Sequence, residues 1–483
     1  MKKTFISSFI LCIFLAVLSF NTSAQEYKYD LNKYYTPDIF RNKLNLNFNS
    51  LGSFSNQLYK RDTLNINTQN SNILYGTLGS SFQSYKNTRK KVSYLDMNLN
   101  LQGQFNNSDN KPNYDSSPIG NSSNSNESFN LGYMSNFYNS TNQFLSVGIT
   151  TRINSATSNF REVHINVVNT SANSSINAGI TPAVGIGIGR IESVKDARQA
   201  IYILDDLSKR GALSRHLSDD EIFKFSQLIS QVKNKRFLDA RLHKIDEITS
   251  VDSFLVNNSL LAQSDAGYFT TLYDNWENGA NFERNSGQIF EIVLSPSADW
   301  FNKDGQSDVS NPVANYWAKQ NNYNYRAVLS FNYNYAKQMN LNWEKTFDIS
   351  LSGATGYFSD KLLSNIGNGE TISTYNNHSI SIQGNYSIGY YPNSRTNLSA
   401  GLYQHLLQNF NRGISDNSSY NYFFSQTILR FSAVYYVSPQ LSLSGNASIG
   451  NIYEQNAFSS DNINTNNNNL GANFAATLKY SFF

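Results

Sequence analysis

Residues 470–483 read LGANFAATLKYSFF, a stretch in which apolar side chains alternate with small or polar ones. One face of an extended chain would carry Leu470, Ala472, Phe474, Ala476, Leu478, Tyr480 and Phe482. The other face would carry mainly Asn, Ala, Thr, Lys and Ser. Because side chains alternate across a strand with a period of two, the stretch predicts a terminal amphipathic strand.

A terminal strand of this kind, with aromatic residues at its end, resembles the C-terminal assembly signal of bacterial outer-membrane β-barrel proteins. The matching residues are Tyr480, Phe482 and Phe483, with Phe482 in the place that the final residue usually takes. The resemblance implies that the barrel-assembly machinery and outer-membrane lipid are partners. The alternative is the last strand of a soluble sheet, and repetition of the pattern along the chain favours the barrel.

Residues 1–24 have the three parts of a secretory signal peptide: Lys2 and Lys3, an apolar run at 5–20, and small residues at 22–24. A retained membrane anchor is disfavoured because the apolar run is short. Cys12 is the only cysteine and lies in this segment, so we expect no disulfide and no thiolate metal site in the exported chain. Sec export and an outer-membrane location in a Gram-negative bacterium follow as expectations.

The composition limits both the kind of partner and the fold class that fit this chain. Lys2 and Lys3 supply two of the formal net charge of +3, so the exported chain is nearly neutral, which argues against a nucleic-acid partner. Mean hydropathy is −0.45 and no other run approaches the length of a transmembrane helix. With 31 Tyr and 32 Phe, two classes remain: a transmembrane β-barrel, or a large secreted β-sandwich or β-helix.

The remaining segments predict an all-β transmembrane antiparallel β-barrel of about 14 strands, with 12 to 16 possible. Residues 25–42 read as a periplasmic lead-in, 43–190 as strands one to six, and 281–483 as strands seven to fourteen. The clearest strand carries Tyr323, Tyr325, Ala327, Leu329, Phe331, Tyr333 and Tyr335 on one face. Long loops are predicted at 106–127, 296–321 and 358–374, and they alternate with short turns. That alternation places both termini in the periplasm.

Residues 191–280 form a predicted helical insertion on the same periplasmic side. Of the 70 residues at 193–262, 21 are charged, and apolar residues recur at every third or fourth position. Capping boxes are predicted at Ser193 with Asp196 and at Ser218 with Glu221. Third, fourth and fifth helices are predicted around Leu238, Leu242 and Ile245; Val251, Phe254 and Leu255; and Tyr268, Leu272 and Trp276.

Strand six ends in a glycine-rich stretch next to this insertion. With its isoleucines facing lipid, Gly179, Gly185, Gly187 and Gly189 would face the lumen and leave room for a bulky neighbour. We therefore predict that the helices pack against this wall as a plug or gate. A separate periplasmic subdomain is the alternative, and the run from Gly189 to Ala200 has the look of a family-specific element without an assignable role.

The lumen face is predicted to be mostly Asn, Ser, Gln and Gly with few charges, which suits small polar solutes. Its charged residues would be Asp96, Arg152, Glu291, Arg326, Asp348, Arg430 and Lys479. Alternatively, these side chains pair with one another and fill the interior.

No catalytic, cofactor or metal set is predicted. The five histidines form no metal-ligand pair at helical spacing, and His378 near Ser379 and Ser381 is a weak lipase candidate. Omptin-like proteolysis would need His and clustered Asp on outer loops that are mainly Asn and Ser. The glycines at 185–189 alternate as a strand and are no phosphate cradle.

The Asn-rich strands and the Ser-Ala-Gln end of the signal resemble Bacteroidota-type, porin-like outer-membrane barrels. The resemblance implies a non-enzymatic channel or transport protein for small polar solutes. The alternative is an outer-membrane scaffold whose helical unit binds a periplasmic protein partner. Oligomeric state does not follow from the sequence.

Overall fold

In the computed structural model, the chain forms one antiparallel sheet of fourteen strands with helices inserted between the sixth and seventh. The structure describes residues 29–480 except 63–64, 113–118, 165–166, 236–239, 280, 311–312, 366–368, 415–418, 439 and 459–462. The predicted signal peptide at 1–24, and Phe482 and Phe483 of the predicted assembly signal, lie outside the described residues.

The strands are β1 (Ile39–Asp62), β2 (Asn65–Asn87), β3 (Lys91–Pro112), β4 (Ile119–Tyr138), β5 (Gln143–His164), β6 (Val167–Ser193), β7 (Asn285–Ser310), β8 (Val313–Gln338), β9 (Trp343–Ser364), β10 (Glu370–Asn393), β11 (Thr396–Gly413), β12 (Ser419–Tyr436), β13 (Leu441–Phe458) and β14 (Ile463–Tyr480). The helices are the short η2 (Leu31–Lys33) and then α2 (Lys195–Lys209), α3 (Asp219–Lys233), α4 (Ala240–Asn257) and α5 (Ala266–Asn278).

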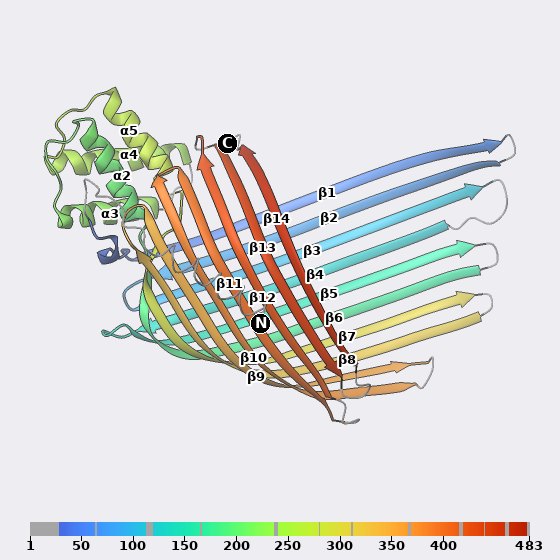
Figure 1. Ribbon diagram of the computed structural model, residues 1–483. Helices are drawn as coiled ribbons and strands as arrows, with labels where there is room; N and C mark the ends of the chain where they lie inside the picture. Colours follow the sequence, from blue (N-terminus) through green and yellow to red (C-terminus); the bar gives the residue numbers. More distant parts are fainter. Residues whose placement is uncertain are drawn as a thin grey trace.

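Each strand pairs with the next one along the chain, in the order β1 to β14. This is the up-and-down topology of an antiparallel β-barrel wall. The sheet curls so that β11–β14 cross in front of the first strands, and the described pairings do not join the two edge strands β1 and β14 (Figure 1). The predicted fold class is confirmed: an all-β antiparallel chain of the barrel type, with fourteen strands and a helical insertion.

The strands are longer than the sequence pattern predicted. The segments 106–127, 296–321 and 358–374, predicted as long loops, are largely strand, and β8 begins at Val313, soon after β7 ends at Ser310. Their Asn, Ser and Asp residues gave no apolar alternation to detect. Antiparallel neighbours satisfy each other's backbone groups whatever side chains they carry, so the ladders continue.

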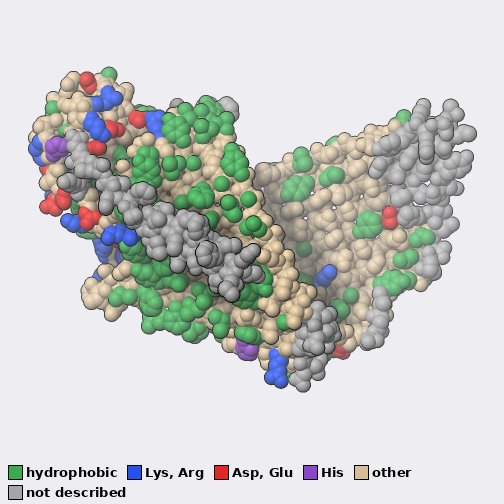
Figure 2. Space-filling model, in the orientation of Figure 1, with side chains coloured by type: hydrophobic (Ala, Val, Ile, Leu, Met, Phe, Trp, Pro, Cys, Tyr) green, Lys and Arg blue, Asp and Glu red, His purple; other side chains and the backbone are tan. Residues whose placement is uncertain are grey.

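One face of the sheet carries a belt of exposed apolar side chains. On β8, Tyr325, Leu329 and Phe331 are 53, 43 and 38% exposed. On β10 the belt runs from Ile380 to Tyr390, which matches the roughly 9–11 residues that a tilted strand needs to cross a bilayer. The hydrophobic groups form large patches over the strands in Figure 2. A contiguous exposed apolar surface of this kind is typical of a face that contacts a membrane or another protein.

Two prolines face each other within the belt. β7 continues through Pro296, which was predicted to begin a loop, and Pro296 still pairs with Ala327 of β8. The β6–β7 register breaks between Ile180 and Val184, at the position where Pro182 would meet Pro296. Because neither proline has an N–H to donate, β6 and β7 do not pair at this step. The pairing of β6 with β5 and of β7 with β8 continues through the prolines.

The helices have a water-excluding core of their own. Leu204, Phe225, Ile229 and Leu255 are fully buried in a cluster that also takes Leu31, Tyr34 and Leu341 from outside the insertion. No helix among the described residues is long and apolar enough to span a membrane.

Two helix predictions need correction. Within the described residues the predicted third and fourth helices are one continuous helix, α4, whereas Leu238 of the predicted third helix lies outside them. The capping box predicted at Ser193 is absent, because α2 is capped by Val194 without a side-chain bond. The second box is confirmed: Ser218 accepts from the Glu221 backbone and the Glu221 carboxylate accepts from the Ser218 backbone.

The helices lie beyond the strand ends, at the end of the sheet that bears the short turns 88–90, 339–342 and 394–395 (Figure 1). The N–H of Val194 donates to the carbonyl of Arg284 at 2.8 Å, so the insertion leaves and rejoins the sheet at one point.

Candidate functional site: the polar wall and the joint

All seven residues predicted to line a pore lie on one face of the sheet, opposite the apolar belt. Residues that are paired across neighbouring strands share a face of the sheet, and the pairings follow this face from strand to strand. Arg152 pairs with Gly179, which pairs with Asp299; Glu291 pairs with Asn332, and Arg430 pairs with Ser448. We call this face the polar wall; its predicted members are Asp96, Arg152, Glu291, Arg326, Asp348, Arg430 and Lys479. That it surrounds a pore stays a prediction.

Most of these charges have partners within the wall. Arg152 of β5 reaches over β6 to the Asp299 carboxylate at 3.1 Å, passing the side-chain-free position of Gly179. Arg326 donates to the Ser379 hydroxyl at 3.1 Å across β9. The sequence of a single strand does not reveal these bonds, since each joins strands that are not neighbours.

The acidic members are held by amides. Asp96 accepts from Gln83 at 3.0 Å and also from Asn98. Glu291 accepts from Asn332 at 3.2 Å, and Asn385 donates to Asp348 at 3.4 Å. Amide partners keep the carboxylates oriented without neutralising their charge.

The two remaining cations differ. Arg430 lies over the Tyr403 ring, 5.1 Å from its centre, and Lys479 is exposed on β14 opposite Ser442. Neither makes an ion pair with a carboxylate of the described residues.

Neighbouring strands occupy the space beside the glycine wall: the atoms nearest to a side chain placed at Gly179, Gly185, Gly187 or Gly189 belong to strands. Contact of these glycines with the helices stays a prediction. A side chain at Gly187 would collide with the ring of Phe144, and one at Gly185 with Val293. Gly189 has φ +99°, a conformation that L side chains rarely adopt, where β6 bends towards the helices. The helical insertion does contact the turns, through Arg284 with Leu341 and Asp274 with Arg395, and the small residues here fit close strand packing and the bend.

His378 and the two serines near it do not form a site. His378 bonds Thr355 on the belt face, whereas Ser379 and Ser381 lie on the polar wall. Ser381 does meet His405, Oγ to Nε2, at 3.0 Å. His405 has only Ser381 and Gln383 as described polar partners, so no carboxylate orients the imidazole as a nucleophile's base requires. The described residues also contain no cluster of metal ligands.

The helices are attached to the sheet through a set of polar contacts that we call the joint. Its first part uses Arg190 and Glu192, where β6 ends. The Arg190 Nε lies 2.7 Å from the Glu192 carboxylate, which also pairs with Arg89 at 3.2 Å and accepts from the Thr36 hydroxyl at 2.8 Å. Arg190 in turn donates to Asn87. The β2–β3 turn and the lead-in are thereby tied to the start of the insertion.

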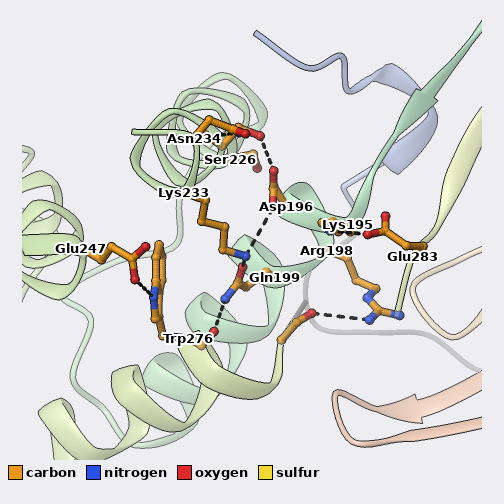
Figure 3. Close-up of polar contacts among 12 residues, drawn as sticks. Lys195, Asp196, Arg198, Gln199, Ser226, Lys233, Asn234, Glu247, Trp276 and Glu283 are labelled. Carbon is orange, nitrogen blue, oxygen red and sulfur yellow. Dashed lines mark hydrogen bonds and ion pairs between the residues drawn. The ribbon is translucent and has the colours of Figure 1, made fainter. Parts of the chain in front are cut away.

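The second part of the joint lies between α2, α3 and α5 (Figure 3). Asp196 accepts from Ser230, whose hydroxyl also meets that of Tyr34 at 3.0 Å. Lys233 reaches both Asp196 and Gln199, and Gln199 donates to the Trp276 carbonyl at 2.8 Å. Burial lowers the pKa of Lys233, and the Asp196 charge opposes that shift.

Two arginines are buried where the helices meet the turns. Arg284 donates to the carbonyls of Leu341 and Asn340 and lies 4.5 Å from the centre of the Tyr391 ring. Arg198 of α2 lies 5.1 Å from the same ring. Burial, together with the Arg198 charge, lowers the pKa of Arg284 to about 10, so Arg284 stays charged at neutral pH. Burial also lowers the pKa of Arg198. Glu344, which accepts from the Tyr391 hydroxyl at 3.1 Å, is the nearby carboxylate.

Further contacts complete the joint. Arg395 of the β10–β11 turn pairs with Asp274 of α5. Asn32 of η2 donates to the Gln338 carbonyl at 3.0 Å and accepts from Ser286 at 2.7 Å. Sequence reasoning missed the joint as a site, although the run Gly189–Ala200 that it singled out supplies Arg190, Glu192 and Asp196.

No family model matches the chain, and no curated protein is similar to it. Among solved structures, similarity is found to the toluene transporter TodX of Pseudomonas putida, at 9% identity over 89% of this chain and 94% of that one, with TM-score 0.28. The ferric yersiniabactin uptake receptor FyuA of Yersinia pestis matches at 6% identity over 89% and 62%, with TM-score 0.32. The outer membrane protease OmpT of Escherichia coli matches at 13% over 41% and 85%, with TM-score 0.17.

These neighbours are bacterial outer-membrane β-barrel proteins. Their TM-scores are too low to carry an argument about activity or substrate, so function has to rest on the chain's own geometry.

Proposed function

We propose that this protein is a channel of the bacterial outer membrane that passes small polar solutes. One observation carries the proposal: the same strands present an apolar belt on one face and the polar wall on the other. A lipid environment offers no partner to the N–H and C=O groups of a sheet edge. Pairing of β1 with β14 would remove both edges and enclose the polar wall as the lining of a lumen.

In this arrangement the joint and the helices face the periplasm. Short turns occupy the periplasmic end of outer-membrane barrels, and the turns at 88–90, 339–342 and 394–395 lie at the end that bears the helices. The polar extensions of β1–β10 would then project from the cell. The helical unit, held at several turns, would control access to the periplasmic mouth.

A deletion tests channel and gate together. Ser193 pairs with Asn285, so an Asn-Gly turn can replace residues 194–284 without disturbing the ladder. Conductance in planar bilayers is measured for the full chain and the deletion. Larger or more frequent openings in the deletion support a gate, and equal conductance supports an ungated channel. Silence of both proteins, with folded barrels verified by heat-modifiable gel migration, contradicts the channel.

A scaffold is the second candidate, because the helices present an apolar surface. Ile245 and Val256 of α4 are 64 and 51% exposed, and Phe269 and Tyr273 of α5 are each 45% exposed. A photo-crosslinking residue at Ile245 should capture a periplasmic protein in cells if the unit is a docking module. The same residue at Ser253, on another exposed part of α4, is the control. Equal labelling at both positions contradicts specific docking.

A further inference from the structure

The polar wall is hollowed over β10–β14. A cavity of about 460 Å³ lies there, and its lining includes Asn385, Ser387, Ser399, Ser432, Ser448 and the guanidinium-bearing Arg430. Gly401 stands directly opposite Arg430, and Ser387 directly opposite Gly401. These short side chains leave the floor open beside the arginine. The cavity therefore combines space, hydroxyl and amide groups, and a positive charge.

The charge of Arg430 is not neutralised by the wall. Among the described residues no carboxylate or other acceptor takes its N–H groups, and its contact is the face of the Tyr403 ring. Other arginines of the polar wall do have acceptors: Asp299 accepts a hydrogen bond from Arg152, and Ser379 accepts one from Arg326. Along the strand pairings, the nearest acidic positions are Asp348 and Glu344, both on β9 and therefore three strand spacings, roughly 14 Å, across the sheet from Arg430. Asn385 already donates to Asp348, and Tyr391 donates to Glu344.

The floor offers additional hydrogen-bonding groups to a ligand. The hydroxyl oxygens of Ser399 and Ser432 lie 2.6 Å apart, so one hydroxyl donates to the other. The second hydroxyl hydrogen and the remaining lone pairs can then bond to a ligand. A guanidinium matches the two oxygens of a carboxylate or phosphate, and an aromatic ring beneath it holds the plane in place. An anion is the ligand that this set of groups complements.

We propose that the cavity around Arg430 is an anion-binding site for small solutes that carry a carboxylate or phosphate group. The inference rests on the proposed channel, whose solute class it narrows from polar to anionic. In a closed barrel, an unpaired cation on the wall raises the local concentration of anions and lowers that of cations. Arg430 is then the residue that sets charge preference, whereas the paired Arg152 and Arg326 shape the wall.

Selectivity gives the first test. The chloride-to-potassium permeability ratio is obtained from reversal potentials under a salt gradient, for the wild type, Arg430→Lys, Arg430→Ala and Arg430→Glu. We expect the ratio to stay within twofold for lysine and to fall by roughly tenfold for glutamate. Lys345→Glu is the matched control, because Lys345 carries the same charge on the belt face beside Tyr335. A conducting Arg430→Glu channel with an unchanged ratio overturns the proposal.

Phosphate binding gives a test that does not require conduction. Inorganic phosphate should raise the unfolding temperature of the full-length protein in detergent, since a ligand that binds only the folded state stabilises it. The shift should persist in Lys345→Glu and disappear in Arg430→Glu. If the protein does not conduct but phosphate still raises its unfolding temperature in an Arg430-dependent way, the channel proposal is refuted and the binding site stands. Absence of any shift in the wild type, or a shift unaffected by Arg430→Glu, refutes the site.

Discussion

The helical unit and the sheet are built for different solvents. The unit buries Leu204, Phe225 and Leu255 completely, as a water-soluble domain does, whereas the sheet leaves Leu44, Phe48 and Ile186 more than 60% exposed. Water drives the first to fold through its apolar core. The second is held by backbone ladders, with its apolar residues left for lipid. A substitution should therefore be able to unfold the helical unit while the sheet stays folded, and stability measurements on suitable variants should distinguish the two parts.

The largest separation is expected from a core truncation. Phe225→Ala removes a fully buried ring that stacks on Phe254, and should destabilise the helical unit by roughly 3–5 kcal/mol. Ile186→Ala is the matched change in the sheet, where the side chain is 64% exposed and should matter little in detergent. Urea titration followed by helical circular dichroism measures the first, and heat-modifiable migration measures the sheet. Equal sensitivity of both probes to Phe225→Ala would show that the two parts unfold as one.

A slightly smaller effect is expected at the joint. Arg284→Ala removes the donors to Leu341 and Asn340 and leaves the Glu344 carboxylate buried beside Tyr391, at a cost of about 3 kcal/mol. Detachment should appear as faster proteolysis near the insertion while the sheet stays intact. The exposed Arg210, which follows the last residue of α2, gives the control: Arg210→Ala should be cut at the wild-type rate.

Loss of a helix cap should be milder. Ser218→Ala deletes the acceptor for the Glu221 backbone N–H and should lower the unfolding free energy of the helical unit by about 1 kcal/mol. Ser253→Ala, an exposed site within α4, should be neutral. A cost at Ser218 no greater than that at Ser253 would mean that tertiary packing alone holds α3.

The smallest effect depends on pH. Hydrogen bonds from Arg215 and from the Ser218 backbone lower the pKa of Glu221 to about 2. A carboxylate with a depressed folded-state pKa stabilises the fold above its unfolded pKa of about 4.3, and that contribution fades as pH falls towards 2. Glu221→Gln should therefore be less stable than the wild type at neutral pH and nearly equal to it at pH 2. A constant difference across this range would contradict the assignment.

The fold was largely predictable and the joint was not. Alternation in segments such as Tyr323–Tyr335 fixed the strand faces, and the switch to helical spacing near Ser193 located the insertion. Alternation vanishes where both faces of a strand meet water, so the sequence of the β7 and β8 extensions predicts loops where the structure has strands. The joint brings Thr36, Asn87 and Glu192 together from three distant segments, and only tertiary packing determines such a meeting.

The meeting of Val194 with Arg284 also sets the order in which the helical unit can be completed along the chain. Among the described residues, its buried core draws on Leu31 and Tyr34 near the start, on residues 194–276, and later only on Leu341. If the proposed export and assembly in the outer membrane apply, most of this core can form once residue 284 has crossed the inner membrane, before β7–β14 are delivered. The barrel-assembly machinery would then receive a chain that carries a nearly complete folded body between its first six strands and its last eight.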